Sequence, residues 1–234
     1  MNIKISHKVF HLEEAKERKQ YADSINKYLQ AYSNDLNTKT IRISDQSDFL
    51  KEIQNNPDFN LDFNGYNLDN IQGWRYGEVG LWISNFIAWK EFSKSESDIG
   101  IFMEDDILYN NDFIDLLIEY IEEIPEDWDA FFFAVPPGQF HKYDSESMDF
   151  GAKSTCRVYQ DHWMLCYVLS KNGVKKAIDS VRMGVSLPLD WHFFRQRNLF
   201  NSYSLKPDSK FACFGSPTDT TFQNQERKVM TIDS

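Results

Sequence analysis

Short apolar stretches typical of strands alternate along this chain with apolar residues at helical spacing, and together they predict strands that alternate with helices. A short apolar stretch predicts a strand over 9–12, and apolar residues at helical spacing then predict a helix over 13–32. A second strand is expected over 40–43. It is followed by a short helix over 49–53 that ends before Pro57.

The same reading continues to the C-terminal third of the chain. It predicts helices over 77–92, 113–124, 172–181 and 190–197, and buried strands over 99–103, 130–135 and 164–169. Strands that alternate with helices are typical of an α/β domain, so we predict an α/β fold with a mostly parallel central sheet flanked by helices. The stretches 55–75 and 136–154 have neither spacing. We expect two long loops there, at least one of which orders over a bound ligand and excludes water.

Length and charge narrow the function classes. A chain of 234 residues is expected to form one domain. It carries 25 Lys and Arg against 36 Asp and Glu, a formal charge of −11, which disfavours generic binding to a phosphate backbone. An anionic small substrate is still compatible with this charge if a metal ion or a local basic patch supplies positive charge.

Cysteine content and hydropathy indicate the compartment. Three cysteines are too few for a disulfide framework or a four-ligand zinc site. The first residues lack the apolar stretch of a signal peptide, and no run approaches the roughly 18 apolar residues of a membrane span. We therefore expect a soluble, cytoplasmic protein with no transmembrane segment.

Three consecutive acids form the most distinctive motif. Glu104, Asp105 and Asp106 directly follow the apolar strand predicted over 99–103. In open α/β sheets, binding sites gather at the carboxyl ends of strands, so these acids are expected to reach a crevice. Their mutual repulsion would be relieved by a hard divalent cation, Mg²⁺ or Mn²⁺, bound together with substrate phosphates. The alternative is a solvated turn in which an Asp side chain accepts from the backbone.

Four further polar positions suggest a site. Glu78 lies at the start of the helix predicted over 77–92, where its charge suits the helix dipole, and Ser84 and Asn85 are adjacent polar residues among apolar neighbours. Arg18 either reaches a phosphate or pairs with a glutamate, Glu14, one helical turn earlier. Asp190 is either a helix N-cap or a base in a partly apolar site.

Four blocks in this order resemble glycosyltransferase family 25, which includes lipooligosaccharide-type sugar transferases and the collagen hydroxylysine galactosyltransferases. The first block, at 9–18, is an opening strand with its arginine, and the second, at 77–89, is a Gly-Glu helix with a Ser-Asn pair and a Trp. The third, at 101–106, is a strand-borne Glu-Asp-Asp. The fourth, at 167–190, is a strand ending in Ser that is followed by a helix and by an Asp after a proline. The chain departs from the family at Asn85, where the family has His, and at Cys166, where it has Gly.

The resemblance implies a GT-A fold and a metal-dependent, inverting transfer from a nucleotide sugar, most simply a UDP-hexose. It implies Mn²⁺ (or Mg²⁺) on Glu104 and Asp106, with Asp190 as the base. It implies a nucleotide-sugar side over about 1–110 and an acceptor side over about 111–234 of a single domain. The donor-binding residues that it implies are Leu12, Arg18, Glu78, Ser84, Asn85, Glu104 and Asp105.

Three functional classes follow. The leading hypothesis is transfer to a glycan hydroxyl, as in lipopolysaccharide biosynthesis. The second keeps the chemistry but modifies a hydroxymethylated base in DNA, as some phage enzymes do, and the third is a non-catalytic relative that only binds nucleotide or sugar. The net charge disfavours the nucleic-acid acceptor, although a local basic face is conceivable at Lys171, Lys175, Lys176 and Arg182, or at Arg195 and Arg197.

Overall fold

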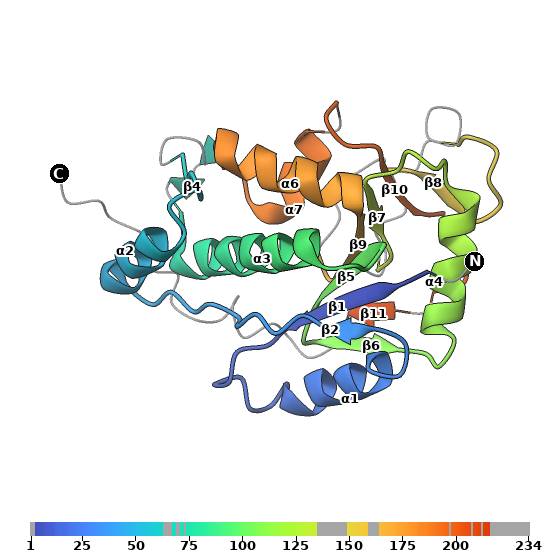
Figure 1. Ribbon diagram of the computed structural model, residues 1–234, viewed down its shortest axis with the longest axis horizontal. Helices are drawn as coiled ribbons and strands as arrows, with labels where there is room; N and C mark the ends of the chain where they lie inside the picture. Colours follow the sequence, from blue (N-terminus) through green and yellow to red (C-terminus); the bar gives the residue numbers. More distant parts are fainter. Residues whose placement is uncertain are drawn as a thin grey trace.

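A seven-stranded sheet with the order β2-β1-β5-β9-β7-β10-β8 forms the centre of the computed structural model (Figure 1). The structure describes residues 3–62, 67–68, 71–72, 74–134, 149–158, 164–196, 198–206, 208–211 and 213–215. The strands of this sheet are β1 (Ile5–Phe10), β2 (Asn34–Asp35), β5 (Ile99–Glu104), β7 (Ala130–Phe132), β8 (Thr155–Arg157), β9 (Cys166–Ser170) and β10 (Ser202–Leu205). Two small antiparallel pairs lie outside it: β3 (Asn67–Leu68) with β4 (Ile71–Gln72), and β6 (Ile107–Tyr109) with β11 (Cys213–Gly215).

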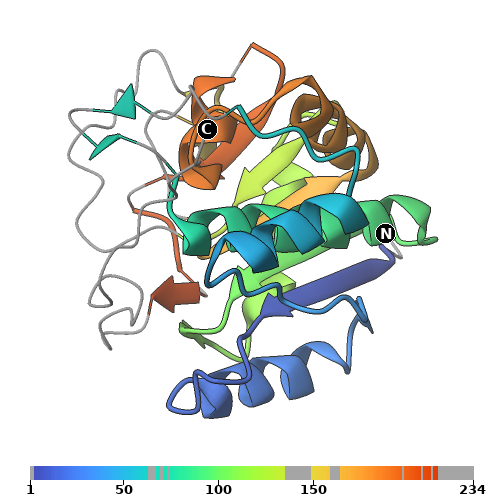
Figure 2. The ribbon, with the colours of Figure 1, turned by 90° about the vertical axis from the view of Figure 1, so that its left-hand side faces the viewer.

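Helices cover both faces of the sheet (Figures 1 and 2). Side chains of α3, α6 and α7 share one hydrophobic cluster, and side chains of α1 and α4 share the other. Helix α2 packs at the outer end of α3. The bounds are α1 (Lys19–Leu29), α2 (Gln46–Asn55), α3 (Tyr76–Lys94), α4 (Phe113–Glu123), α6 (Lys171–Met183) and α7 (Leu189–Arg195). No helix within these described ranges is both long and apolar enough to cross a membrane.

The alternation of strand side chains explains the two clusters. In β5, Phe102 packs toward α3, while Ile101 and Met103 pack toward α1 and α4. In β9, Tyr167 and Val168 divide in the same way. A strand buried on both faces reads as a continuous apolar run, which is why β5 could be predicted from the sequence.

The predicted α/β fold class is confirmed, and the sheet is mixed in direction. Strands β2, β1, β5, β7 and β10 run one way, whereas β9 and β8 run antiparallel to their neighbours. The longest ladder joins β1 to β5 in parallel, from Ile5 opposite Ile99 to Phe10 opposite Glu104. The carboxyl ends of these two strands therefore meet at one edge of the sheet.

Several predicted elements differ from the structure. The helix expected over 13–32 begins only at Lys19, and the strand expected over 40–43 is absent from the described chain there. Residues 40–43 are instead an irregular segment held against α3, as described below. Strands β8, β10 and β11 were not predicted, and most of the expected loop over 136–154 lies outside the described residues. The expected loop over 55–75 contains the β3–β4 pair.

Candidate functional site

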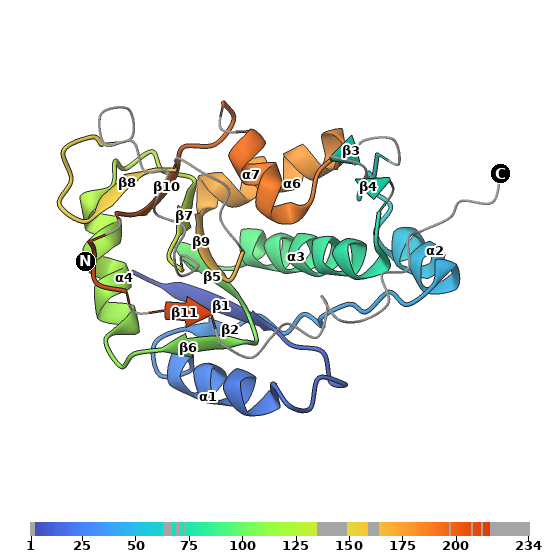
Figure 3. The same ribbon diagram turned by 180° about the vertical axis from the view of Figure 1, so that it is seen from behind.

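The acidic turn, Glu104–Asp105–Asp106, lies where β5 ends and β6 begins. Because β1 and β5 end in register, His11 follows the last β1 residue directly opposite Asp105. Asp105 and Asp106 are 3% and 2% exposed, so the two aspartates of the turn are buried, while Glu104 is half-buried. The prediction that these acids end a buried strand is confirmed. On its other side the turn is followed by β6, which pairs with β11 from the C-terminal part of the chain (Figure 3).

Asp105 joins the two strand ends through two short contacts. Its Oδ1 lies 2.7 Å from Nη1 of Arg18, and its Oδ2 lies 2.7 Å from Nδ1 of His11. The same guanidinium nitrogen is 3.8 Å from Oδ2 of Asp106. Arg18 is itself buried, and an ion pair taken out of water in this way is strongly coupled to the geometry of the residues that hold it. Asp105 therefore fixes the segment after β1 onto the turn after β5.

The expected pairing of Arg18 with Glu14 is wrong. That expectation assumed a helix over 13–32, but residues 13–18 form turns and Arg18 is the N-cap position of α1. Without helical geometry the two side chains do not lie one turn apart. Glu14 pairs with Arg42 at 3.2 Å instead, on the surface.

The guanidinium of Arg18 contacts two of the three acids at the turn, Asp105 and Asp106. Burial, followed by the charges of Asp106 and Asp105, raises the pKa of Glu104 to about 8, and Asp190 contributes in the same direction. Burial also raises the pKa of Asp106, against the effect of Arg18. Oδ1 of Asp106 is buried and accepts no hydrogen bond in the structure. A buried acceptor without a partner is costly, so this turn holds negative charge that the surrounding protein does not balance.

The oxygen donors of the turn fit a hard divalent cation. Glu104 and Asp106 supply carboxylate oxygens, and the partnerless Oδ1 of Asp106 is the atom that such a cation would satisfy. Within the described part of the chain no three His, Cys, Asp or Glu side chains are grouped as a metal site. Mg²⁺ and Mn²⁺ commonly take one or two protein carboxylates and complete their shell with water and substrate phosphate, so carboxylates such as those of Glu104 and Asp106 suit them.

Ser84 on α3 is fully buried, and its hydrogen-bonding partners are backbone groups. Its hydroxyl donates to the carbonyl of Gly80 and accepts from the N–H of Ile41, both at 2.7 Å. A Cβ at Gly80 would lie 2.8 Å from the Ile41 carbonyl oxygen, so only glycine allows this close approach. The two residues hold the irregular segment 40–43 against α3.

Asn85 and Glu78 also have protein partners. The Asn85 side chain donates to the Leu81 carbonyl and accepts from the hydroxyl of Tyr167, within the buried cluster. Glu78 accepts from the backbone N–H of Arg75 at 3.1 Å, which completes a capping box at the start of α3. These bonds shape the helix beside the site. Burial raises the pKa of Tyr167, the partner of Asn85, and the charge of Glu104 contributes in the same direction.

Asp190 lies in the first turn of α7, whose N-cap position is Pro188. Its Oδ1 accepts from the N–H of Trp191 at 3.0 Å. It is near enough to the turn for its charge to raise the pKa of Glu104. The position of α7 is fixed by buried bonds, because Nε1 of Trp82 donates to the carbonyl of Leu187 and His192 bonds Ser180.

The last of the expected donor-binding residues is Leu12, which follows β1 in the chain. Leu12 is half-buried in the turn after β1, where its carbonyl accepts from Ala15. His11 was missed by sequence reasoning, which took no histidine as a candidate. The available signal was its position directly after a predicted strand, at the same edge of the sheet as the acidic turn.

Comparisons with known proteins point to sugar transferases. No protein-family model matches the chain. It is 26% identical over 117 residues to procollagen galactosyltransferase 1-B of Xenopus laevis, which covers 49% of this chain and 19% of that protein. It is 25% identical over 117 residues to mouse procollagen galactosyltransferase 2, covering 49% of this chain and 18% of that protein. The match thus spans about a fifth of the length of these curated relatives.

Solved structures with a similar course of the chain are remote. One is a Drosophila β-1,4-galactosyltransferase 7 in complex with manganese, UDP-Gal and xylobiose, with a TM-score of 0.48 and 12% identity over 99% of this chain and 77% of that one. Another is a glycosyltransferase involved in glycosylating the major capsid protein of PBCV-1, with a TM-score of 0.48 and 8% identity over 94% of this chain and 96% of that one.

Proposed function

We propose that this chain is a metal-dependent, inverting glycosyltransferase of the GT-A type that moves a hexose from a UDP-sugar to a hydroxyl group of a glycan. The observation that carries the proposal is the buried acidic turn at the joined ends of β1 and β5, where Asp106 retains a carboxylate oxygen without a partner. The similarity to procollagen galactosyltransferases over half the chain supports the same reaction class. We place the protein in the cytoplasm and its acceptor among lipopolysaccharide-type glycans.

In this proposal Glu104 and Asp106 hold Mn²⁺ or Mg²⁺. When bound, the cation supplies positive charge for the diphosphate leaving group. Arg18 neutralises Asp105 and part of Asp106, so that the turn folds before the ligand arrives. Leu12 and the segment after β1 line the donor side. Ser84, Asn85 and Glu78 support the donor side through the bonds that hold α3 and the 40–43 segment in place.

Asp190 is the proposed base for the acceptor hydroxyl. An inverting displacement needs one group that accepts the proton of the attacking hydroxyl, opposite the leaving diphosphate. Two observations support this role: the charge of Asp190 contributes to the raised pKa of Glu104, and α7 belongs to the part of the chain after residue 111 that we assign to the acceptor. The bonds of Trp82 and His192 hold α7 in place, so the carboxylate is positioned by buried groups.

The structure offers less support for a DNA acceptor. The conceivable basic face on α6 is largely engaged by the protein itself. Nζ of Lys171 donates to the carbonyls of Phe92 and Ser95 at the end of α3, while Lys176 and Arg182 pair with Asp129 and Asp58. Side chains that already balance internal charges contribute little to phosphate binding. We expect no measurable DNA binding at physiological salt, and transfer that depends weakly on salt.

A donor screen tests the proposal. The protein is incubated with a panel of nucleotide sugars and Mn²⁺, and released nucleotide is measured with and without a chelator. We expect nucleotide release from a UDP-hexose. The chelator should abolish this release, and the variant Asp106→Asn should not show it. Glu119→Gln removes a charge from an exposed position of α4 and is the matched control. No release and no binding of any nucleotide with metal would contradict the proposal, and transfer of label to hydroxymethylated DNA would favour the DNA alternative.

A further inference from the structure

His11 is held at two points beside the acidic turn. Its backbone N–H donates to Oγ1 of Thr40 at 3.1 Å, and its ring nitrogen Nδ1 contacts Asp105 at 2.7 Å. Thr40 precedes Ile41, which Ser84 ties to α3. The backbone of His11 is therefore held by Thr40, and its ring is held by Asp105.

The other ring nitrogen of His11 has no protein partner. Nε2 is covered and forms no hydrogen bond in the structure. The side chain as a whole is 15% exposed, compared with 4% for Asp105 and 7% for Arg18, so it is the member of this trio that lies nearest to solvent. A buried polar atom with no partner in the protein is available to a ligand.

The contact with Asp105 determines what Nε2 can do. A carboxylate that already binds Arg18 is an acceptor, so Nδ1 carries the proton in this contact. In the neutral ring Nε2 is then a hydrogen-bond acceptor, with a lone pair directed away from Asp105. As an acceptor, this atom suits a hydroxyl or an imide N–H of a ligand.

We propose that His11 is a ligand-contacting residue whose Nε2 accepts a hydrogen bond from a hydroxyl or imide N–H of the nucleotide sugar, with Asp105 as the residue that fixes its tautomer. This inference rests on the proposed function, since it names a contact within the same site. It also gives Asp105 a role distinct from that of its neighbours: it orients His11 and Arg18, while Glu104 and Asp106 hold the cation.

Two variants separate ligand contact from structural support. In His11→Asn the amide nitrogen lies near the position of Nδ1 and retains the bond to Asp105, but nothing replaces Nε2. In His11→Gln the amide reaches the position of Nε2 and leaves Asp105 without this partner. We therefore expect His11→Asn to keep the melting temperature of the wild type while it binds ligand about 3- to 10-fold more weakly, the worth of one neutral hydrogen bond. We expect His11→Gln to melt earlier and to bind more tightly than His11→Asn.

The experiment is calorimetric titration of each protein with UDP and with UDP-hexoses, all in the presence of Mn²⁺. A loss in His11→Asn on both ligand types supports a contact to the nucleoside, and a loss on UDP-hexoses alone supports a contact to the sugar. Wild-type affinity in His11→Asn for every ligand overturns the inference and leaves His11 a structural residue. If the wild type binds none of these ligands, the proposed function is wrong and the inference falls with it.

Discussion

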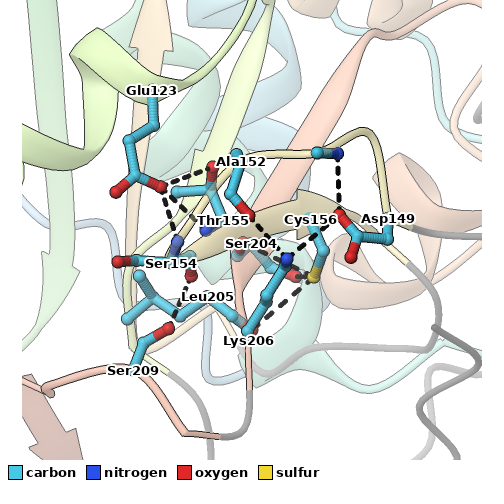
Figure 4. Close-up of polar contacts among 11 residues, drawn as sticks. Glu123, Asp149, Ala152, Ser154, Thr155, Cys156, Ser204, Leu205, Lys206 and Ser209 are labelled. Atoms are coloured by element: carbon cyan, nitrogen blue, oxygen red, sulfur yellow. Dashed lines mark hydrogen bonds and ion pairs between the residues drawn. The ribbon is translucent and has the colours of Figure 1, made fainter.

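Two groups of charged side chains in this molecule differ in how many hydrogen-bond and ion-pair partners they have. The clasp, formed by Glu123, Asp149, Ser154, Thr155 and Lys206, ties the end of α4 to β8 and β10 (Figure 4). Oε2 of Glu123 accepts from the N–H groups of Ser154 and Thr155 at 2.7 and 3.1 Å, and Nζ of Lys206 donates to Asp149 and to the Ala152 carbonyl. Each charge in the clasp has several partners of suitable type.

The acidic turn has the opposite balance. Asp106 keeps a buried oxygen without a partner, and burial together with its two acidic neighbours raises the pKa of Glu104 to about 8. The bonds of the clasp stabilise the fold, whereas the buried, partnerless oxygen of Asp106 costs stability. A cluster of acids that the fold leaves incompletely paired commonly marks a functional site.

The largest expected effect concerns Asp190, to which we assign a catalytic role and no role in folding. Asp190→Asn is expected to lower the rate of sugar transfer ~10²- to 10⁴-fold, as expected for loss of a general base, while UDP and Mn²⁺ binding persists. Steady-state kinetics and calorimetry measure the two quantities. Asp115→Asn is the matched control, because Asp115 lies in the first turn of α4 as Asp190 does in α7. Unchanged turnover with an equal, small loss of stability in both variants would reduce Asp190 to a helix-end charge.

The second expected effect is a pH dependence of stability that comes from the buried His192 of α7. Burial lowers the pKa of His192 to about 4 from its usual 6.5. Below pH 6.5 the unfolded chain therefore binds a proton that the imidazole ring in the native protein does not bind. Stability should fall as pH drops from about 6.5 to about 4, by on the order of 3 kcal/mol. His7, whose pKa burial also lowers, adds to this trend, and Glu104, whose pKa is raised, opposes it.

The variant His192→Gln isolates the contribution of His192. A glutamine can bond Ser180 without titrating, so denaturant unfolding across pH 4–7 should show a shallower pH dependence than the wild type, while His7 and Glu104 act equally in both. Parallel curves for the two proteins would mean that His192 does not remain neutral in the fold.

The smallest expected effect is on the clasp itself. Glu123→Ala leaves the N–H groups of Ser154 and Thr155 without their acceptor, which should cost about 1–3 kcal/mol of unfolding free energy. Ligand affinity should be unchanged. Glu122→Ala, at the exposed neighbouring position, is the control for loss of charge and side chain. A fall in nucleotide affinity in Glu123→Ala alone would remove the distinction between the two regions.

Where the sequence predicted the fold, apolar spacing decided the structure. The apolar runs of β5 and β9 and the helical spacing in α3 and α4 located these elements within a few residues. The β1 strand begins earlier than predicted because it contains Ser6 and His7, which are buried and bonded to Ser97 and Ser33. Spacing cannot distinguish such satisfied polar residues from exposed ones.

Where the prediction failed, distant contacts decided the structure. The segment 40–43 reads as a strand, but Ser84 and Gly80 hold it against α3 outside the sheet. At the site, the acids could be placed from the sequence because a strand end is a local feature. The pairing of Arg18 with Asp105 and the role of His11 depend on the parallel register of β1 and β5, which joins residues more than 80 positions apart.

Thermal unfolding of the wild type and of Asp106→Asn tests whether the acidic turn binds a cation together with a diphosphate, as we propose. With Mn²⁺ and UDP at ~100 times the dissociation constant, the wild type should gain about 2.7 kcal/mol and melt roughly 5 to 11 °C higher. Asp106→Asn should show no such gain, and without ligand it should melt no earlier than the wild type, because it removes an unbalanced buried charge. An equal shift in both proteins, or no shift in the wild type with any nucleoside diphosphate and metal, would contradict the account.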